Sequence, residues 1–189
     1  TELAIDGHND LWAANRFGLH WLDGENWVFY SGEEIGVILP SESMVFDSEG
    51  TLHLITRGYW TFSEGSWTDH YNEYPHDITL HVVDVAPNGD VWLGGGKGVL
   101  HFDGVTWESF LINDYLPDII NVVIESIAID KSGNVWCGTS QDGVLVYDGE
   151  NWKQFTEEQG LGGTHDIYIK VGPGGTVWCG GNKTENNVT

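Results

Sequence analysis

The chain has 189 residues, of which 40% are hydrophobic and 13% aromatic, enough for the packed core of one domain. Its 29 acidic residues against 7 Lys and Arg give a formal net charge of −22 at pH 7, which argues against nucleic-acid binding and against adsorption to anionic lipid. No apolar run is long enough for a transmembrane helix, so the sequence predicts no membrane insertion.

A repeat of roughly 40 residues runs through the chain. Each copy has an aromatic residue or histidine after a first turn, then a glycine that opens the next strand, and a tryptophan nine residues after that glycine. The first position holds Trp12, His53, Trp92, Trp136 and Trp178; the glycine is Gly18, Gly58, Gly98 and Gly143; the second tryptophan is Trp27, Trp67, Trp107 and Trp152. This register predicts four short antiparallel strands per copy, which we name A to D.

The turns between these strands have recognisable sequences. The A–B turn reads Asp-x-x-Gly at Asp47–Gly50 and Asp130–Gly133, where the Asp side chain caps the turn and the glycine adopts a positive φ. The C–D turn is Asp-Gly in three copies, a strong hairpin signal. The second copy deviates, because His53 replaces the tryptophan and Ser63-Glu64 replaces Asp-Gly.

Taken in order, the elements predict an all-β propeller of four-stranded antiparallel blades. The blades cover residues 1–30, 44–71, 81–110 and 124–155, followed by a half blade at 166–181 and a polar tail at 182–189. About four and a half blades do not close a ring. We therefore expect either a fragment of a larger propeller, or another subunit that covers the blade-five edge at Trp178 and the first-blade face near Leu3, Ile5 and Trp12.

Two cysteines follow the strand-B tryptophan in successive copies. Cys137 and Cys179 therefore occupy equivalent positions on neighbouring blades, and we expect them to be too far apart for a disulfide. Both are interpreted as small buried hydrophobic residues.

Three segments resemble the two-component regulator propeller family: Ile127–Thr139, Glu158–Gly181 and Val85–Gly95. The resemblance covers most of residues 1–181 and is weakest in the second copy. The resemblance implies the propeller fold, and the family motif contains no catalytic residue. Such repeats are similar to those in periplasmic sensor regions of bacterial hybrid histidine kinases, which are thought to sense glycans. A periplasmic or extracellular location is implied in the same way.

The longer and more variable loops of an up-and-down blade, B–C and D–A, share one face, so a ligand is expected there. Arg16, Arg57 and Lys97 take equivalent places in three B–C loops and predict a cationic patch around the channel mouth for an anionic glycan. Tyr74 and Tyr115, in D–A loops, are candidates for stacking on sugar rings. The alternatives are that the basic residues pair with nearby acids and that the tyrosines cap the neighbouring blade.

Three classes of function stay open. The first is a non-enzymatic sensor or binding propeller, with a small molecule or glycan as its partner. The second is a structural or assembly protein whose open blade joins another subunit. The third is a propeller lyase similar to the streptogramin lyases, for which His53 is the one acid–base candidate, with a packed core histidine as the alternative. No catalytic, metal or cofactor motif is recognised, so we expect no cofactor and no metal.

Overall fold

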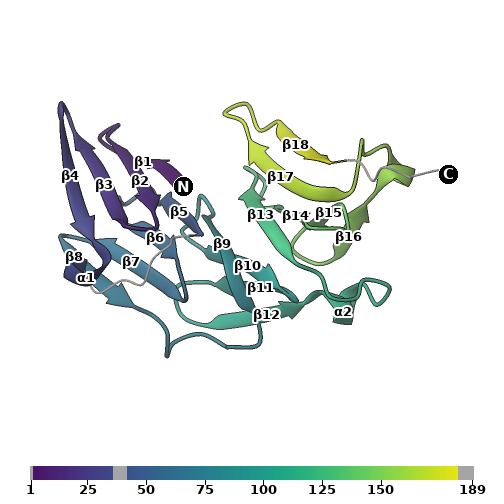
Figure 1. Cartoon of the computed structure of the whole chain (residues 1–189). Helices are drawn as coiled ribbons and strands as arrows, with labels where there is room; N and C mark the ends of the chain where they lie inside the picture. Colours follow the sequence, from purple (N-terminus) through teal and green to yellow (C-terminus); the bar gives the residue numbers. More distant parts are fainter. Residues whose placement is uncertain (1, 36–41, 183–189) are drawn as a thin grey trace.

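The structure, a computed structural model, describes residues 2–35 and 42–182, apart from the side chains of residues 34 and 35. It contains four four-stranded antiparallel sheets and one two-stranded sheet, which confirms the predicted fold class. Figure 1 shows these sheets as blades around a common axis, with strand A of each blade innermost. The first blade and the two-stranded half blade lie on opposite sides of the opening in this arc.

The blades follow the repeat. Blade one consists of β1 (Glu2–Ile5), β2 (Leu11–Asn15), β3 (Gly18–Asp23) and β4 (Asn26–Ser31). Blade two consists of β5 (Ser43–Phe46), β6 (Leu52–Ile55), β7 (Tyr59–Ser63) and β8 (Ser66–Asp69). Blade three consists of β9 (Thr79–Val85), β10 (Val91–Gly96), β11 (Gly98–Phe102) and β12 (Trp107–Leu111), and blade four of β13 (Ile124–Ile129), β14 (Val135–Thr139), β15 (Val144–Tyr147) and β16 (Trp152–Phe155). The half blade contains β17 (His165–Val171) and β18 (Val177–Asn182).

In the described part of the chain, three short helical turns lie in the connections between blades: α1 (Gly32–Ile35), α2 (Ile112–Tyr115) and the 3-10 turn η1 (Glu157–Gln159). Among the described residues, no helix is long and apolar enough to cross a membrane.

The repeat glycine at the start of strand C is required because the backbone of strand D lies very close to it. A Cβ at Gly18, Gly98 or Gly143 would overlap the carbonyl oxygen of the facing residue on strand D. Gly58 is the exception, since its nearest neighbour would be the Tyr74 hydroxyl at 3.5 Å, an ordinary contact. The B–C turn of blade two is therefore less constrained than those of the other blades.

The hydrophobic core is divided among the interfaces between consecutive blades. Each buried cluster combines residues of two neighbouring blades, as in the contact of Trp92 and Phe110 of blade three with Tyr147 of blade four. Trp12 and Trp92 of strand B thus pack on aromatic rings of the next blade. Burial of apolar side chains, aromatic and aliphatic, stabilises each interface.

Hydrogen bonds between neighbouring A strands add to this packing near the axis. The Ser43 hydroxyl accepts from the Val83 amide at 3.2 Å, which joins blade two to blade three. The Asp84 carboxylate accepts from the Ile129 amide at 3.1 Å, which joins blade three to blade four. The Ser126 hydroxyl joins blade four to the half blade through two bonds, to the Ile167 carbonyl at 3.0 Å and from the Ile169 amide at 2.9 Å.

At the two ends of the arc, two expectations from the sequence are wrong: that Trp12 belongs to the open face of blade one, and that Cys179 is buried. Leu3 and Ile5 are exposed on the outer face of blade one, but Trp12 is buried against Phe46 and Phe62 of blade two, so it does not belong to that face. The two cysteines are free, as predicted, and Cys137 is buried, but Cys179 is exposed. The equivalent Cys137 lies opposite Leu145 of strand C. Cys179 has no such neighbour, because no described strand C pairs with β18.

Candidate functional site

The three basic residues of the predicted patch lie in equivalent loops. Arg16 lies between β2 and β3, Arg57 between β6 and β7, and Lys97 between β10 and β11. Antiparallel pairing places these loops at the edge of each blade opposite the A–B and C–D turns. All three side chains are exposed.

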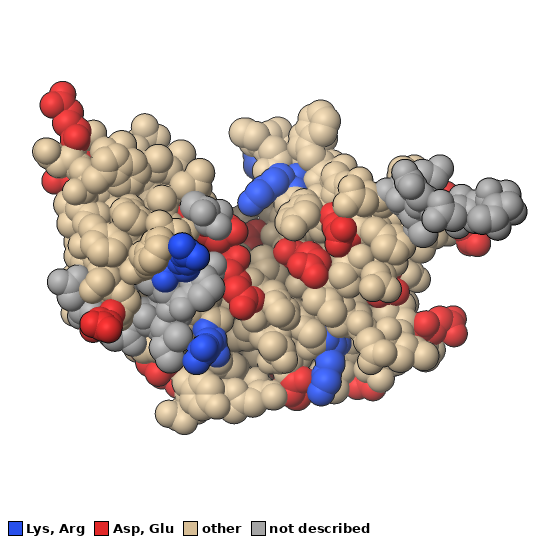
Figure 2. All heavy atoms as spheres, viewed as in Figure 1, with Lys and Arg blue, Asp and Glu red and all other residues tan. Residues whose placement is uncertain are grey.

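These three side chains are not neutralised by direct ion pairs with described residues. The Arg16 guanidinium lies 4.6 Å from the ring centre of Phe17, which is itself exposed. Lys153, by contrast, pairs with Asp148 at 2.6 Å near a C–D turn. Figure 2 shows Lys and Arg side chains around the hollowed centre of the molecule, interspersed with Asp and Glu.

The two tyrosines of the predicted site differ in exposure. Tyr74 is buried, with its ring 5.8 Å from that of Trp107 in blade three and 4.9 Å from His76. Its ring is thus occupied by packing between blades. Tyr115, at the end of α2, is 46% exposed and lies 5.9 Å from Phe110, so part of its ring is open to solvent.

The centre of the arc is a cavity of about 750 Å³ lined by the A strands of all five blades. Its lining includes four carboxylates and one lysine: Glu2, Glu42, Asp84, Glu125 and Lys170. Arg16, Arg57 and Lys97 do not line it. The lining of the axial cavity is thus mainly acidic, and the cationic patch around the channel mouth stays a prediction.

A smaller groove of about 380 Å³ opens on the loop face. Lys97 lines it together with Asn113 and Asn121 from the connection between blades three and four. Of the five residues predicted to bind a ligand, Lys97 is thus placed in a groove, and Asn113 and Asn121 are neighbours that the repeat did not reveal.

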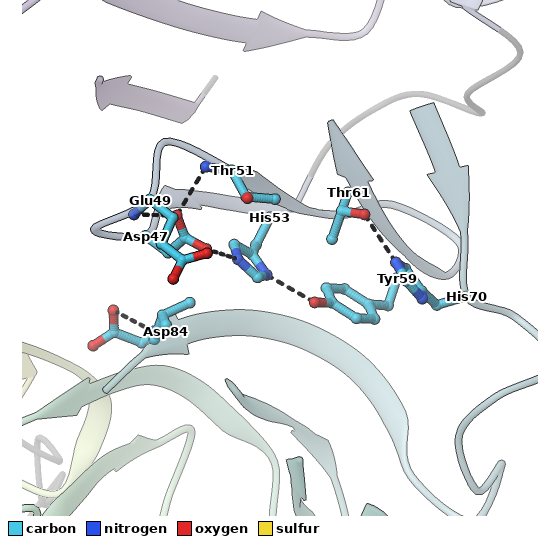
Figure 3. A network of polar contacts seen from close by, with 9 residues as sticks. Asp47, Glu49, Thr51, His53, Tyr59, Thr61, His70 and Asp84 are labelled. Carbon is cyan, nitrogen blue, oxygen red and sulfur yellow. Dashed lines mark hydrogen bonds and ion pairs between the residues drawn. The ribbon is translucent and has the colours of Figure 1, made fainter. Parts of the chain in front are cut away.

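His53 occupies the strand-B position of blade two and is buried. Figure 3 shows its two ring nitrogens between two partners: the Asp47 carboxylate at 3.2 Å from Nε2 and the Tyr59 hydroxyl at 2.7 Å from Nδ1. The Tyr59 ring stacks on His70, which in turn bonds Thr61 at 2.9 Å. This chain of polar groups is closed to solvent at His53 and Tyr59.

Burial determines the protonation of this pair. It lowers the pKa of His53, although the hydrogen bond and charge of Asp47 act in the opposite direction. It also raises the pKa of Tyr59, to which the charges of Asp47 and Glu73 contribute. Both groups are therefore neutral at pH 7, and both side chains are buried. His53 is a packed core histidine.

The role of the turn aspartate is wider than the sequence indicated. Besides capping its turn, it accepts a hydrogen bond from the strand-B ring six residues later: Trp12 to Asp6 at 3.1 Å and Trp136 to Asp130 at 3.0 Å. His53 makes the same bond to Asp47. The constant spacing of six in these three blades was the available signal.

The half blade leaves large side chains uncovered. Trp178 is 68% exposed and Tyr168 is 63% exposed, both on the face turned away from blade four. Trp136 of blade four stacks on Phe155 of its own blade, 6.4 Å away, and Phe155 is partly exposed. The apolar face predicted near Trp178 is present in the structure.

The sequence pattern of the family described as two component regulator propeller matches residues 118–141, which include β13 and β14. This match confirms the resemblance over that repeat. No curated protein matches the chain.

Solved structures show the same fold. The extracellular domain described as that of the hybrid two component system BT4673 from B. thetaiotaomicron is 17% identical, with a TM-score of 0.74 over 95% of this chain and 26% of that chain. The corresponding domain of BT3049 from the same organism is 17% identical, with a TM-score of 0.75 over 94% of this chain and 26% of that chain. Virginiamycin B lyase from Staphylococcus aureus is 11% identical, with a TM-score of 0.68 over 98% of this chain and 70% of that chain. This chain therefore spans about a quarter of the two extracellular domains, and the likeness establishes the propeller fold.

Proposed function

We propose that this chain, which carries the two component regulator propeller repeat, is a non-enzymatic binding or sensor module that acts in the periplasm or outside the cell and takes an anionic glycan as its ligand. The observation that carries the proposal is the set of three exposed basic side chains, Arg16, Arg57 and Lys97, in equivalent loops and without an ion pair among the described residues. In a chain with a net charge of −22, such residues favour an anion at those loops.

Two further observations support this proposal. The solved structures named above include domains described as extracellular parts of two component systems. The one acid–base candidate of the sequence, His53, is enclosed by its partners, which favours a binding role over a lyase.

Isothermal titration calorimetry of the 189-residue chain tests the proposal. Acidic oligosaccharides, such as oligogalacturonates, are expected to bind, and the matched neutral oligosaccharides are not. Arg16→Gln and Arg57→Gln should each weaken binding, because each removes a cation from the loop face. Lys153→Gln is the matched control, since Lys153 is paired with Asp148 near the C–D turn. Equal affinity for acidic and neutral sugars, or no binding of either, would contradict the proposal.

A second candidate function rests on the half blade. Trp178 and Tyr168 form an uncovered apolar face beside β18, and natural sheet edges of this kind are covered or charged. We propose that the rest of a longer propeller or another subunit covers this face. Light scattering of the 189-residue chain should then show self-association that Trp178→Ser reduces. A soluble monomer that is indifferent to this substitution would exclude the assembly role.

A further inference from the structure

The groove beside Lys97 has a composition unlike that of the central cavity. The polar residues that line it are Lys97, Asn113 and Asn121, and no acidic residue lines it. We propose that it is the subsite for a single hexuronate unit, whose carboxylate binds Lys97; this inference rests on the anionic ligand proposed above and names its chemistry and place.

The backbone holds Lys97 in position on both sides. Its amide donates to the Val122 carbonyl at 2.8 Å, and its carbonyl accepts from the Ile112 amide at 3.0 Å. The residue has a φ of 82°, in the left-handed region where glycine is favoured, although glycines flank it on both sides. A glycine would occupy this position without strain, so the lysine side chain is present at a cost in backbone conformation.

The polar groups of the groove are available for a ligand. Within the described ranges, the side chains of Lys97, Asn113 and Asn121 make no hydrogen bond or ion pair with the protein, and all three are exposed. An ammonium group binds a carboxylate as a point charge. A carboxamide both donates and accepts, as sugar hydroxyls do, so two carboxamides suit a polyhydroxylated ring better than an aliphatic acid.

The apolar part of the groove complements the faces of a sugar ring. Of its apolar lining residues, Ile119 and Val122 are buried, whereas Pro117 is exposed and Ile120 is 76% exposed. A volume of about 380 Å³ lies at the lower end of the range for small-molecule sites, which fits one monosaccharide unit. The carboxylate, the hydroxyls and the apolar ring face of a hexuronate thus correspond to Lys97, to the two asparagines and to the apolar lining residues.

Ligand-observed NMR and calorimetry with galacturonate and glucuronate test the subsite, with galactose, glucose and acetate as comparison ligands. The uronates are expected to bind at least tenfold more tightly than either the neutral sugars or acetate. Lys97→Gly should reduce uronate affinity at least tenfold and raise the melting temperature, because it removes both the cation and the backbone strain. The opposite changes in the two measurements separate loss of the site from loss of the fold.

Variants outside the groove distinguish failure of this inference from failure of the proposed function. If uronate binding is lost in Arg57→Gln but kept in Lys97→Gly, the anionic ligand stands and the subsite is wrong. If neither uronates nor acidic oligosaccharides bind the unmodified chain, both fail. Binding of acetate as tight as that of the uronates would also overturn the hexuronate assignment. Asn121→Gly should weaken binding of the uronates and leave the weak binding of acetate unchanged.

Discussion

Blades two and four show how one repeat position accepts two different solutions. In blade four, the Trp136 indole donates to Asp130 at 3.0 Å; in blade two, the His53 imidazole makes the equivalent contact with Asp47 at 3.2 Å. The smaller imidazole has a second nitrogen, which bonds the Tyr59 hydroxyl at 2.7 Å. The hydrogen bond to the turn aspartate is therefore common to these two blades, although their rings differ.

The first residue of strand C explains how blade two fills its interface. Tyr59 follows the repeat glycine at the place where the other blades have Leu19, Val99 and Val144. Blade two thus combines a smaller strand-B ring with a larger strand-C side chain. Together, the two side chains keep the interface filled and keep the polar groups of both rings hydrogen-bonded. A single replacement would not do both.

The largest effect is expected when this pair is broken. Tyr59→Val removes a buried ring and leaves His53 without one partner, so we expect a loss of about 3–5 kcal/mol in the free energy of unfolding. His53→Trp alone overfills the interface and should cost about 1–3 kcal/mol. The double variant recreates the arrangement of blade four and is expected to lie much closer to the unmodified chain than the sum predicts. Urea denaturation of the four proteins measures this coupling; simple additivity would mean that the two residues do not compensate each other.

The repeat glycines give the next largest contrast. Gly143 has a φ of 75° and faces the Phe155 carbonyl, so Gly143→Ala is expected to destabilise the chain by about 2–4 kcal/mol. Gly58→Ala meets only ordinary contacts and should change stability by less than about 1 kcal/mol in either direction. Thermal unfolding of both variants decides the matter, and a costly Gly58→Ala would refute the looser turn of blade two.

The overall fold was predictable because the repeat marks it directly. The tryptophan positions and the glycine nine residues before the second of them determine strand order, and Asp-Gly and Asp-x-x-Gly determine the turns. Each of these signals acts within one blade. Local signals of this kind were sufficient to locate the strands and to identify the loops that carry Arg16, Arg57 and Lys97.

Contacts between blades were harder to predict, since they join residues roughly 40 positions apart. The burial of Tyr74 against Trp107 and the exposure of Cys179 depend on which strands stand beside them. The groove at Lys97 likewise forms only where the connection between blades three and four folds back onto a B–C loop. The repeat identifies equivalent residues but does not show that one of them lines a groove.

The serines near the axis offer a smaller contrast between the same two blades. Ser43 and Ser126 both lie four residues before the turn aspartate, but Ser126 makes two bonds to the half blade and Ser43 accepts one from blade three. Ser126→Ala leaves both a buried carbonyl and a buried amide without their partner, and we expect a loss of about 1–3 kcal/mol. Ser43→Ala should cost about 1 kcal/mol. Chemical denaturation measures both, and hydrogen exchange at the Ile169 amide reports the local opening; unchanged exchange in Ser126→Ala would contradict this account.

The pH dependence of blade two is the smallest expected effect. Burial lowers the pKa of His53, so the unfolded chain takes up a proton at higher pH than the folded chain does. The contribution of His53 to the free energy of unfolding is fully present above the ordinary histidine pKa of about 6.5, and it is lost as pH falls below that value. His53→Gln keeps a donor toward Asp47 and an acceptor toward Tyr59 but cannot be protonated, so its stability should fall less than that of the unmodified chain between pH 7 and pH 5. Aspartates held at a lowered pKa, such as Asp47 and Asp130, lose their contribution only below about pH 4, outside this window.

Urea midpoints at the two pH values, with the exposed His8→Gln as control, test the assignment. A drop in His53→Gln as large as in the unmodified chain would show that another group is responsible.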